Sequence, residues 1–141
     1  AFIINSTHMM CHTGRIPKRI QVLCDALLLH PVLVLRKSKM VVGSMEIGGF
    51  SHAAKKYVRK VLQDTRNIDR RILFITYSGM DEKKLQYVRS LVEQYCPFKR
   101  VYVQKASSAI ASNCGPGSFG LLFMRKNDAV VTLAEMPESI E

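Results

Sequence analysis

Asn113-Cys114-Gly115-Pro116-Gly117-Ser118-Phe119-Gly120 is the stretch of this sequence that constrains its backbone most strongly. Three glycines and one proline fall within residues 115–120. Glycine permits positive φ angles and close approach to the backbone, and proline fixes one side of a turn. Residues 107–111 look extended, and 120–124 form an apolar run. We therefore predict a tight, preformed loop between two strands, which either only connects them or also offers backbone N–H groups to a ligand.

A second distinctive segment, His12-Thr13-Gly14-Arg15-Ile16-Pro17, lies about a hundred residues earlier. Proline suits the first turn of a helix, and apolar residues recur after it at helical spacing, so we predict an amphipathic helix over 17–29. Arg15 would then lie beside a helix start, where a carboxylate or phosphate can receive guanidinium and backbone donors together. The alternative is an ordinary exposed arginine in a loop.

The middle of the chain predicts a hairpin followed by a helix. The apolar runs 32–35 and 40–45 flank Lys37-Ser38-Lys39, a pattern typical of a β-hairpin. Gly48-Gly49 interrupts this pattern, and Ser51 is a suitable N-cap for the next helix. The residues expected on the buried face of that helix are Ala54, Tyr57, Val58, Val61 and Leu62.

The second half continues the alternation of strands and helices. Residues 71–77 are almost all apolar, as expected of a central strand covered on both faces. Asp81 is expected to cap a helix that Pro97 ends, and 100–104 reads as another strand. The sequence therefore predicts an α/β (α+β) domain in which helices are layered on a mixed β-sheet. We expect this domain to cover 1–127.

The composition is that of one folded domain with a strong basic charge. The chain has 141 residues, is 48% hydrophobic and carries a formal net charge of +10. No apolar window approaches the roughly 20 residues that span a bilayer, and we expect a cytoplasmic protein. The charge favours anionic partners, but no nucleic-acid-binding motif or aromatic platform accompanies it. Residues 128–141 reverse the balance and form an acidic tail with Asp128, Glu135, Glu138 and Glu141.

The Gly-Arg-Ile and Gly-Pro-Gly motifs, with the elements between them, resemble the C-terminal domain of the DegV family from about Phe2 to Lys126. DegV proteins have two α/β domains that hold a long-chain fatty acid between them. In bacteria that incorporate exogenous fatty acids, they present the bound acid to a separate fatty-acid kinase. The resemblance therefore implies a non-enzymatic lipid-binding module without a cofactor. Its partners would be the fatty acid, an N-terminal domain of the same polypeptide and a fatty-acid kinase. The chain begins with Ala1, which keeps open that it is part of a longer polypeptide.

The resemblance also implies which residues meet the ligand or the kinase. The family's Gly-Arg-Ile arginine falls on Arg15, followed by Ile16, and its final motif falls on Cys114, Gly115, Pro116 and Gly117. Asn113 stands where the family commonly has histidine, so an amide with neutral hydrogen bonds replaces a side chain that titrates near neutral pH. This departure favours the alternative of a regulatory or protein-interaction domain that retains the fold without acyl transfer.

Other residues support weaker hypotheses. Leu23, Leu27 and Phe119 could line an apolar slot, although an ordinary core role also accounts for them. His8, Cys11 and His12 are metal-binding residue types without an evident fourth ligand, so we expect no metal site. Cys114 could be an activated thiol in a loop rich in N–H donors, or it could simply be packed. The four cysteines form no CxxC pair, and no secretory signal opens the chain, so we expect them to be reduced thiols and not a disulfide framework.

Overall fold

Within residues 1–37 and 39–126, which a computed structural model describes, six strands form one mixed sheet in the order β3-β2-β1-β6-β4-β5. Neighbouring strands are antiparallel except β4 and β5, which are parallel and joined through a helix. The strands are β1 (Phe2–Ile3), β2 (Leu29–Arg36), β3 (Lys39–Ile47), β4 (Ile68–Ser78), β5 (Arg100–Lys105) and β6 (Ser118–Arg125). The helices are α1 (His8–His12), α2 (Lys18–Ala26), α3 (Phe50–Val61), α4 (Glu82–Tyr95) and α5 (Ser108–Cys114). The predicted mixed α/β class is confirmed.

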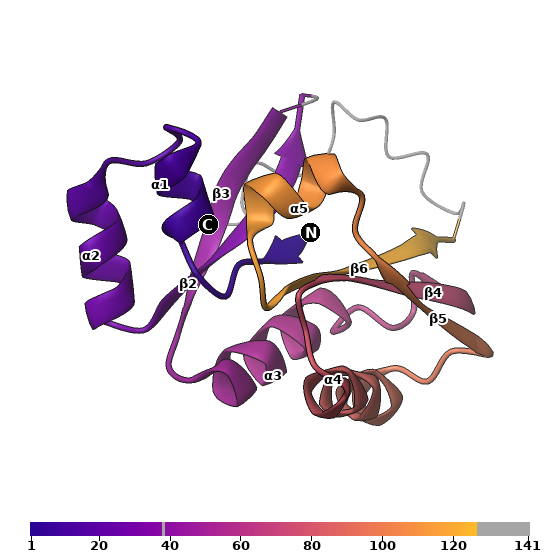
Figure 1. Cartoon of the computed structure of the whole chain (residues 1–141). Coiled ribbons are helices and arrows are strands. Elements are labelled where there is room, and N and C mark those ends of the chain that lie inside the picture. The colour runs from indigo at the N-terminus through magenta and orange to yellow at the C-terminus, as the bar shows by residue number, and fades with distance from the viewer. Residues whose placement is uncertain (38, 127–141) are drawn as a thin grey trace.

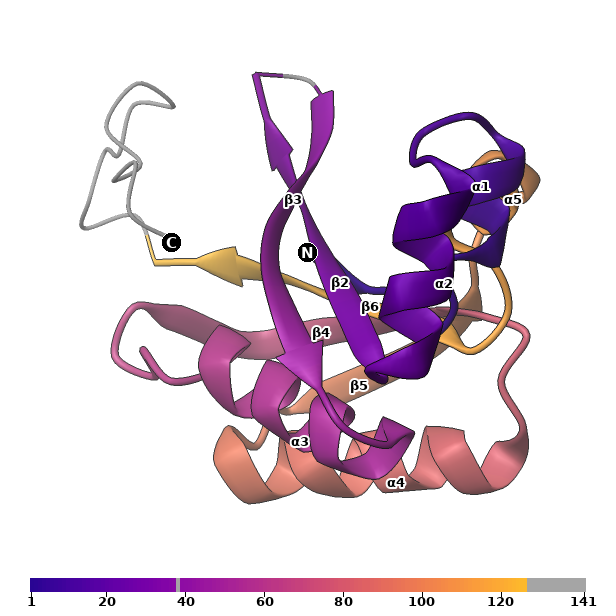
Figure 2. The same ribbon diagram turned by 90° about the vertical axis from the view of Figure 1, so that its left-hand side faces the viewer.

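The helices divide into two groups. The two longest, α3 and α4, lie together beneath one face of the sheet, whereas α1, α2 and α5 gather at one end of the other face (Figures 1 and 2). The hairpin of β2 and β3, predicted around residue 38, is confirmed, with Arg36 opposite Lys39. The described residues contain no helix long and apolar enough to cross a membrane. The acidic tail predicted over 128–141 lies outside these residues.

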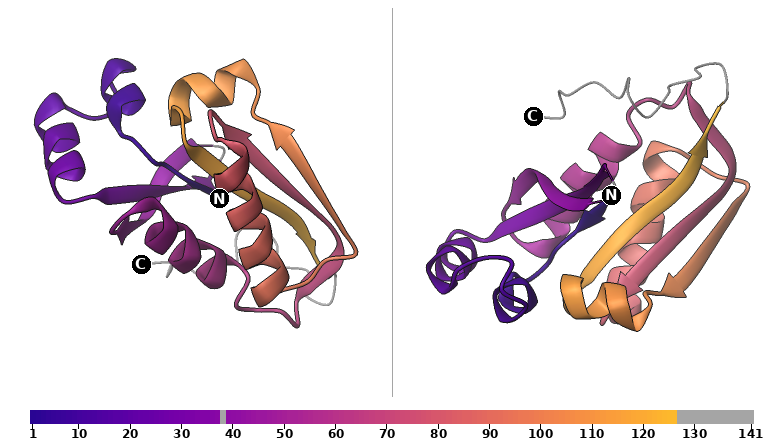
Figure 3. Two further views of the ribbon diagram at one scale, coloured as in Figure 1. Left: turned by 60° about the horizontal axis from the view of Figure 1, so that its bottom comes forward. Right: turned by 90° about the horizontal axis from the view of Figure 1, so that it is seen from above.

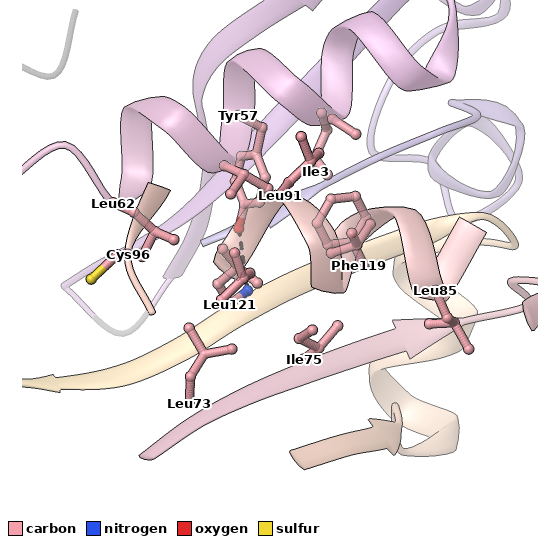
Figure 4. Close-up of a cluster of buried hydrophobic side chains, with 14 of the residues drawn as sticks. Ile3, Tyr57, Leu62, Leu73, Ile75, Leu85, Leu91, Cys96, Phe119 and Leu121 are labelled. Carbon is pink, nitrogen blue, oxygen red and sulfur yellow. Dashed lines mark hydrogen bonds between the residues drawn. The ribbon is translucent and has the colours of Figure 1, made fainter. Parts of the chain in front are cut away.

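The main core lies between the sheet and the pair α3 and α4 (Figure 4). Tyr57 and Phe119 are fully buried there and meet edge to face, with ring centroids 5.4 Å apart. The Tyr57 hydroxyl donates to the carbonyl of Ala1 at 2.6 Å and accepts from the N–H of Leu121 at 3.3 Å. A buried hydroxyl requires such partners, so Tyr57 ties the start of the chain to β6 inside the core.

The predicted caps are confirmed at one helix and wrong at another. Asp81 accepts a hydrogen bond from the N–H of Lys84 at 2.8 Å at the start of α4. Helix α3 instead begins at Phe50, with Gly49 as its N-cap and no side-chain cap, so the expected role of Ser51 is wrong. Because Ser51 already lies in the first turn, its backbone has entered the helix and it cannot be the cap.

The extended segment predicted over 107–111 is wrong, because α5 occupies it. Ser107 is the N-cap, and its hydroxyl accepts from the N–H of Ile110 at 3.4 Å. The helix is too short to show an apolar periodicity, so the sequence pattern did not indicate it. The glycine-rich turn therefore connects a helix to a strand rather than two strands.

The helix predicted over 17–29 is also shorter than expected, and its side chains are more exposed to solvent. It ends at Ala26, and Leu28 takes a left-handed backbone conformation with φ of 49°. Leu29 then pairs with Ile47 at the start of β2, and this pairing removes the last predicted turn from the helix. Only Cys24 is buried within α2.

Among the described residues, little covers the face of the sheet away from α3 and α4. Seen from above, β6, β4 and β5 lie in front of the two long helices (Figure 3). Successive residues of β4 point to opposite faces, so Leu73 and Ile75 are buried, whereas Ile72 and Phe74 are 41% and 37% exposed. The expectation that this strand is covered on both faces is therefore wrong for the described residues. We call Ile72, Phe74, Tyr102, Leu122 and Met124 the open sheet face.

Candidate functional site

The Gly-Pro-Gly turn takes its shape from two left-handed glycines. Helix α5 ends at Cys114, after which Gly115 has φ of 72° and Gly117 has φ of 81°. Pro116 lies between them and is exposed, whereas both glycines are buried. Side chains rarely adopt such φ angles, so the sequence folds into this turn because glycine occupies both positions.

Internal hydrogen bonds use the N–H groups of both glycines. The N–H of Gly115 donates to the carbonyl of Ala111 at 2.9 Å, which closes the end of α5. The N–H of Gly117 donates to the carbonyl of Ser78 at 2.6 Å and lies 3.2 Å from that of Gly79. The Gly117 N–H therefore holds the turn against the end of β4, whereas the Gly115 N–H holds it to α5. The expectation that the turn offers free N–H groups to a ligand is therefore wrong at these two positions.

The turn and the Gly-Arg-Ile segment, distant in sequence, meet in space. Cys114 is buried in a second cluster with Ile4, Met10 and Leu33, and Ile16 packs against that cluster. A side chain at Gly115 would lie 2.9 Å from Met9 of α1, so the turn rests directly on this helix. The structure thus brings both predicted motifs to one end of the molecule, where α1 and α5 are in contact (Figure 1).

Burial and charge act in opposite directions on the Cys114 thiol. Burial raises its pKa, and the nearby positive charge of Arg15 lowers it by a smaller amount, so that the pKa is raised overall. An activated thiolate requires the opposite balance. The structure therefore favours the packing role for Cys114, which is only 3% exposed.

Asn113 is half-buried in the last turn of α5. Its side-chain N–H group donates to the carbonyl of Ala109 at 2.7 Å, a contact within its own helix. This bond fixes the orientation of the amide and uses one of its donors. Asn113 can still accept a hydrogen bond, but it cannot take up or release a proton in the physiological range.

Two polar residues that the sequence did not single out support the turn. The N–H of Asn5 donates to the Ser118 hydroxyl at 3.2 Å, and that hydroxyl donates to the carbonyl of Cys114 at 2.7 Å. Asn5 also packs on Gly117, where an added side chain would lie 2.6 Å from its amide nitrogen. No spacing rule connects residues 113 positions apart, so the sequence carries no signal for this contact.

The described residues enclose no slot of acyl-chain size near the turn. A hollow beside Gly117 and Phe119 has a volume of about 10 Å³, about the room that one water molecule requires. Phe119 is fully buried and borders this hollow, whereas Leu23 of α2 and Leu27, its C-cap, are 50% and 53% exposed and do not line it. The structure therefore does not bring the three predicted lining residues together.

The open sheet face is a broad apolar surface of the described residues. Phe74 and Tyr102 stack there with ring centroids 5.3 Å apart, and Leu122 lies opposite Phe74 on the next strand. Toward the turn, the surface becomes polar where the Gln104 amide donates to the Thr76 hydroxyl at 3.0 Å. A monomer rarely leaves such a contiguous apolar surface in water without a function for it.

Comparison with known proteins shows which solved structures share this fold and to which family the chain belongs. The fold recurs in solved structures whose names record fatty-acid binding. A family model described as "uncharacterised protein, DegV family" matches residues 1–126. The chain belongs to the DegV family. A comparison with curated proteins gives no match.

Three solved DegV-type structures show how far the likeness extends. A protein from Eubacterium eligens, loaded with heptadecanoic acid, is 17% identical, with a TM-score of 0.67 over 89% of this chain and 44% of its own. A fatty-acid-binding DegV protein from Thermus thermophilus is 26% identical, with a TM-score of 0.59 over 85% and 42%. The Streptococcus pneumoniae Fatty Acid Kinase (Fak) B3 protein, loaded with linoleic acid, is 11% identical, with a TM-score of 0.68 over 89% and 43%. This chain spans less than half the length of each of them.

Proposed function

We propose that this chain is the C-terminal half of a fatty-acid-binding protein, which holds a long-chain fatty acid between itself and a second, N-terminal domain. The observation that carries the proposal is the open sheet face in a chain of the DegV family. The relatives named above hold fatty acids, and they are more than twice as long as the part that this chain matches. A second domain would cover the side of the acyl chain that the open sheet face leaves in water.

The energetics of the open sheet face support an apolar ligand. Each buried methylene contributes about 0.8 kcal/mol, so a long acyl chain gains ample affinity if both of its sides are covered. One open face covers only one side, and ordering the ligand offsets part of the gain. This is why we assign binding to the two-domain protein and not to the isolated chain.

For the polar end of the ligand, we propose the turn and the segment beside it: Arg15, Ile16, Asn113, Cys114, Gly115, Pro116 and Gly117. Arg15 would supply positive charge, Asn113 a neutral acceptor, and Cys114 and the two glycines the rigid support. Presentation of the acid to a fatty-acid kinase is part of this proposal. The internally bonded amide of Asn113 favours the second candidate, a regulatory domain that retains the fold without acyl transfer.

The direct test is mass spectrometry of lipids released from the full-length protein. We expect a long-chain fatty acid near one equivalent, and we expect Leu122→Asp to remove most of it by placing a charge in the acyl-binding face. Val22→Asp is the matched control, because Val22 is an exposed apolar residue on α2, outside the open sheet face. Lipid-free wild-type protein from several preparations would contradict lipid binding. Equal lipid loss in both variants would contradict the assignment to this face.

Arg15→Ala tests the polar end. Because Arg15 is exposed, its ion pair with a carboxylate is worth at most about 1 kcal/mol, and we expect fatty-acid affinity to fall about two- to fivefold without loss of folding. Arg19→Ala, on the exposed surface of α2, should have no effect. The measurement is displacement of a fluorescent fatty acid from the full-length protein. Unchanged affinity together with unchanged kinase coupling would remove Arg15 from the site.

A further inference from the structure

Helix α1 carries two exposed histidines one turn apart. His8 and His12 are i and i+4 residues, which lie side by side on a helix surface. Their ring centroids are 4.5 Å apart, and the ring planes are tilted by 50°. We propose that this pair binds a divalent transition-metal ion of the class that prefers imidazole nitrogen, namely Ni²⁺, Cu²⁺ or Zn²⁺.

The ring separation agrees with two imidazoles on one ion. Metal–nitrogen bonds to histidine are about 2.0–2.1 Å long, so two rings at roughly a right angle around one ion have centroids about 4.5 Å apart. Among the described residues, no three histidine, cysteine or carboxylate side chains come together as a metal cluster. The site therefore has two protein ligands, and water or another molecule completes the coordination.

The position of the pair connects the ion to the segment that carries Arg15. Helix α1 has only five residues, and such short helices are marginal without other support. The N–H groups of Gly14 and Arg15 donate to the carbonyls of Cys11 and Met10 at 3.0 and 2.9 Å, so the loop after α1 depends on the helix being formed. An ion bound by both histidines cross-links one turn of α1 at its surface. Because the ion binds only the folded form, it stabilises the helix.

Ni²⁺ titration by calorimetry, on the chain without an affinity tag, tests the site. We expect one ion per chain, and we expect His8→Ala or His12→Ala each to weaken binding by more than about tenfold, or 1.4 kcal/mol. His52→Ala is the matched control, because His52 is an exposed histidine on α3. The apo variants should have wild-type circular dichroism spectra, which separates loss of a ligand from loss of folding.

Two outcomes would overturn the proposal. The first is a Ni²⁺ affinity of His12→Ala equal to that of the wild type. The second concerns the half-buried thiol of Cys11, next to His12: if Cys11→Ser loses as much affinity as the histidine variants, the ion is bound through sulfur and not by the pair. Retained affinity in Cys11→Ser, with loss in both histidine variants, supports the two-histidine site.

Discussion

Replacing Gly117 by alanine should lower the free energy of unfolding by about 2–5 kcal/mol, because a left-handed backbone and a steric conflict act together. Gly117 has φ of 81°, which alanine adopts only with strain. An added Cβ would lie 2.6 Å from the Asn5 amide nitrogen and 3.0 Å from the Asn5 Cβ. The amide can rotate away, but the Cβ is fixed to the backbone, so the turn or the segment after β1 must move.

The control for this prediction is Gly14→Ala. Gly14 has φ of 71°, but an added Cβ would meet no atom within 4 Å, so this variant reports the backbone strain alone. We expect a loss of about 1–2 kcal/mol there, measured by urea denaturation with an unchanged m-value. In an Asn5→Gly background, Gly117→Ala should lower the free energy of unfolding by no more than Gly14→Ala does in the wild type. Equal losses for Gly117→Ala and Gly14→Ala in the wild-type background would show that the contact with Asn5 is unimportant.

The sequence predicted strongly patterned elements correctly and missed those that depend on distant contacts. The hairpin of β2 and β3, the Asp81 cap and the buried face of α3 each have a local signal. Helix α5 does not. Its seven residues contain no apolar periodicity, and only the Ser107 cap marks it. The end of α2 was misplaced because strand pairing at Leu29 overrides helical spacing that continues through Leu28.

The apolar patterns predicted which residues avoid water but not what covers them. The same periodicity that correctly places Val58 and Leu62 in the core also placed Leu23 and Leu27 in a buried face, yet both are half-exposed here. On β4, the apolar run likewise predicted that Phe74 is buried, but its side chain is 37% exposed. The patterns are consistent with a longer protein in which further segments cover these faces, which is the arrangement that we propose.

Both motifs of the candidate site were visible in the sequence, but their contact with each other was not predicted. Nothing local indicates that Cys114 and Ile16 share one cluster, or that the Gly117 N–H is bonded to the end of β4. For Cys114, burial favours packing over reactivity, because N–H donors lower a thiol pKa only when they are available to the thiol.

Tyr57→Phe should lower the free energy of unfolding by about 1–3 kcal/mol, because it removes the partner of one buried and one part-buried backbone group. The part-buried carbonyl of Ala1 would lose a donor, and the N–H of Leu121, inside the core, would lose its acceptor. Tyr87→Phe is the matched control, since it removes an exposed bond of 3.0 Å to the carbonyl of Ser51 and should cost less than about 1 kcal/mol. Equal costs for the two variants would contradict a bridging role for Tyr57.

The same hydroxyl makes the stability of the protein depend on pH in the alkaline range. Burial raises the Tyr57 pKa well above its usual value, an effect that the hydrogen bond from Leu121 offsets only in part. Near pH 10, an unfolded tyrosine loses its proton while folded Tyr57 keeps it. The unfolded state then binds fewer protons, so the free energy of unfolding falls as pH rises past about 10. Urea denaturation at pH 8 and pH 10.5 should therefore show a smaller gap between wild type and Tyr57→Phe at the higher pH. A constant gap would mean that Tyr57 ionises as readily in the folded protein as in the unfolded chain, and that its hydroxyl is not sealed in the core.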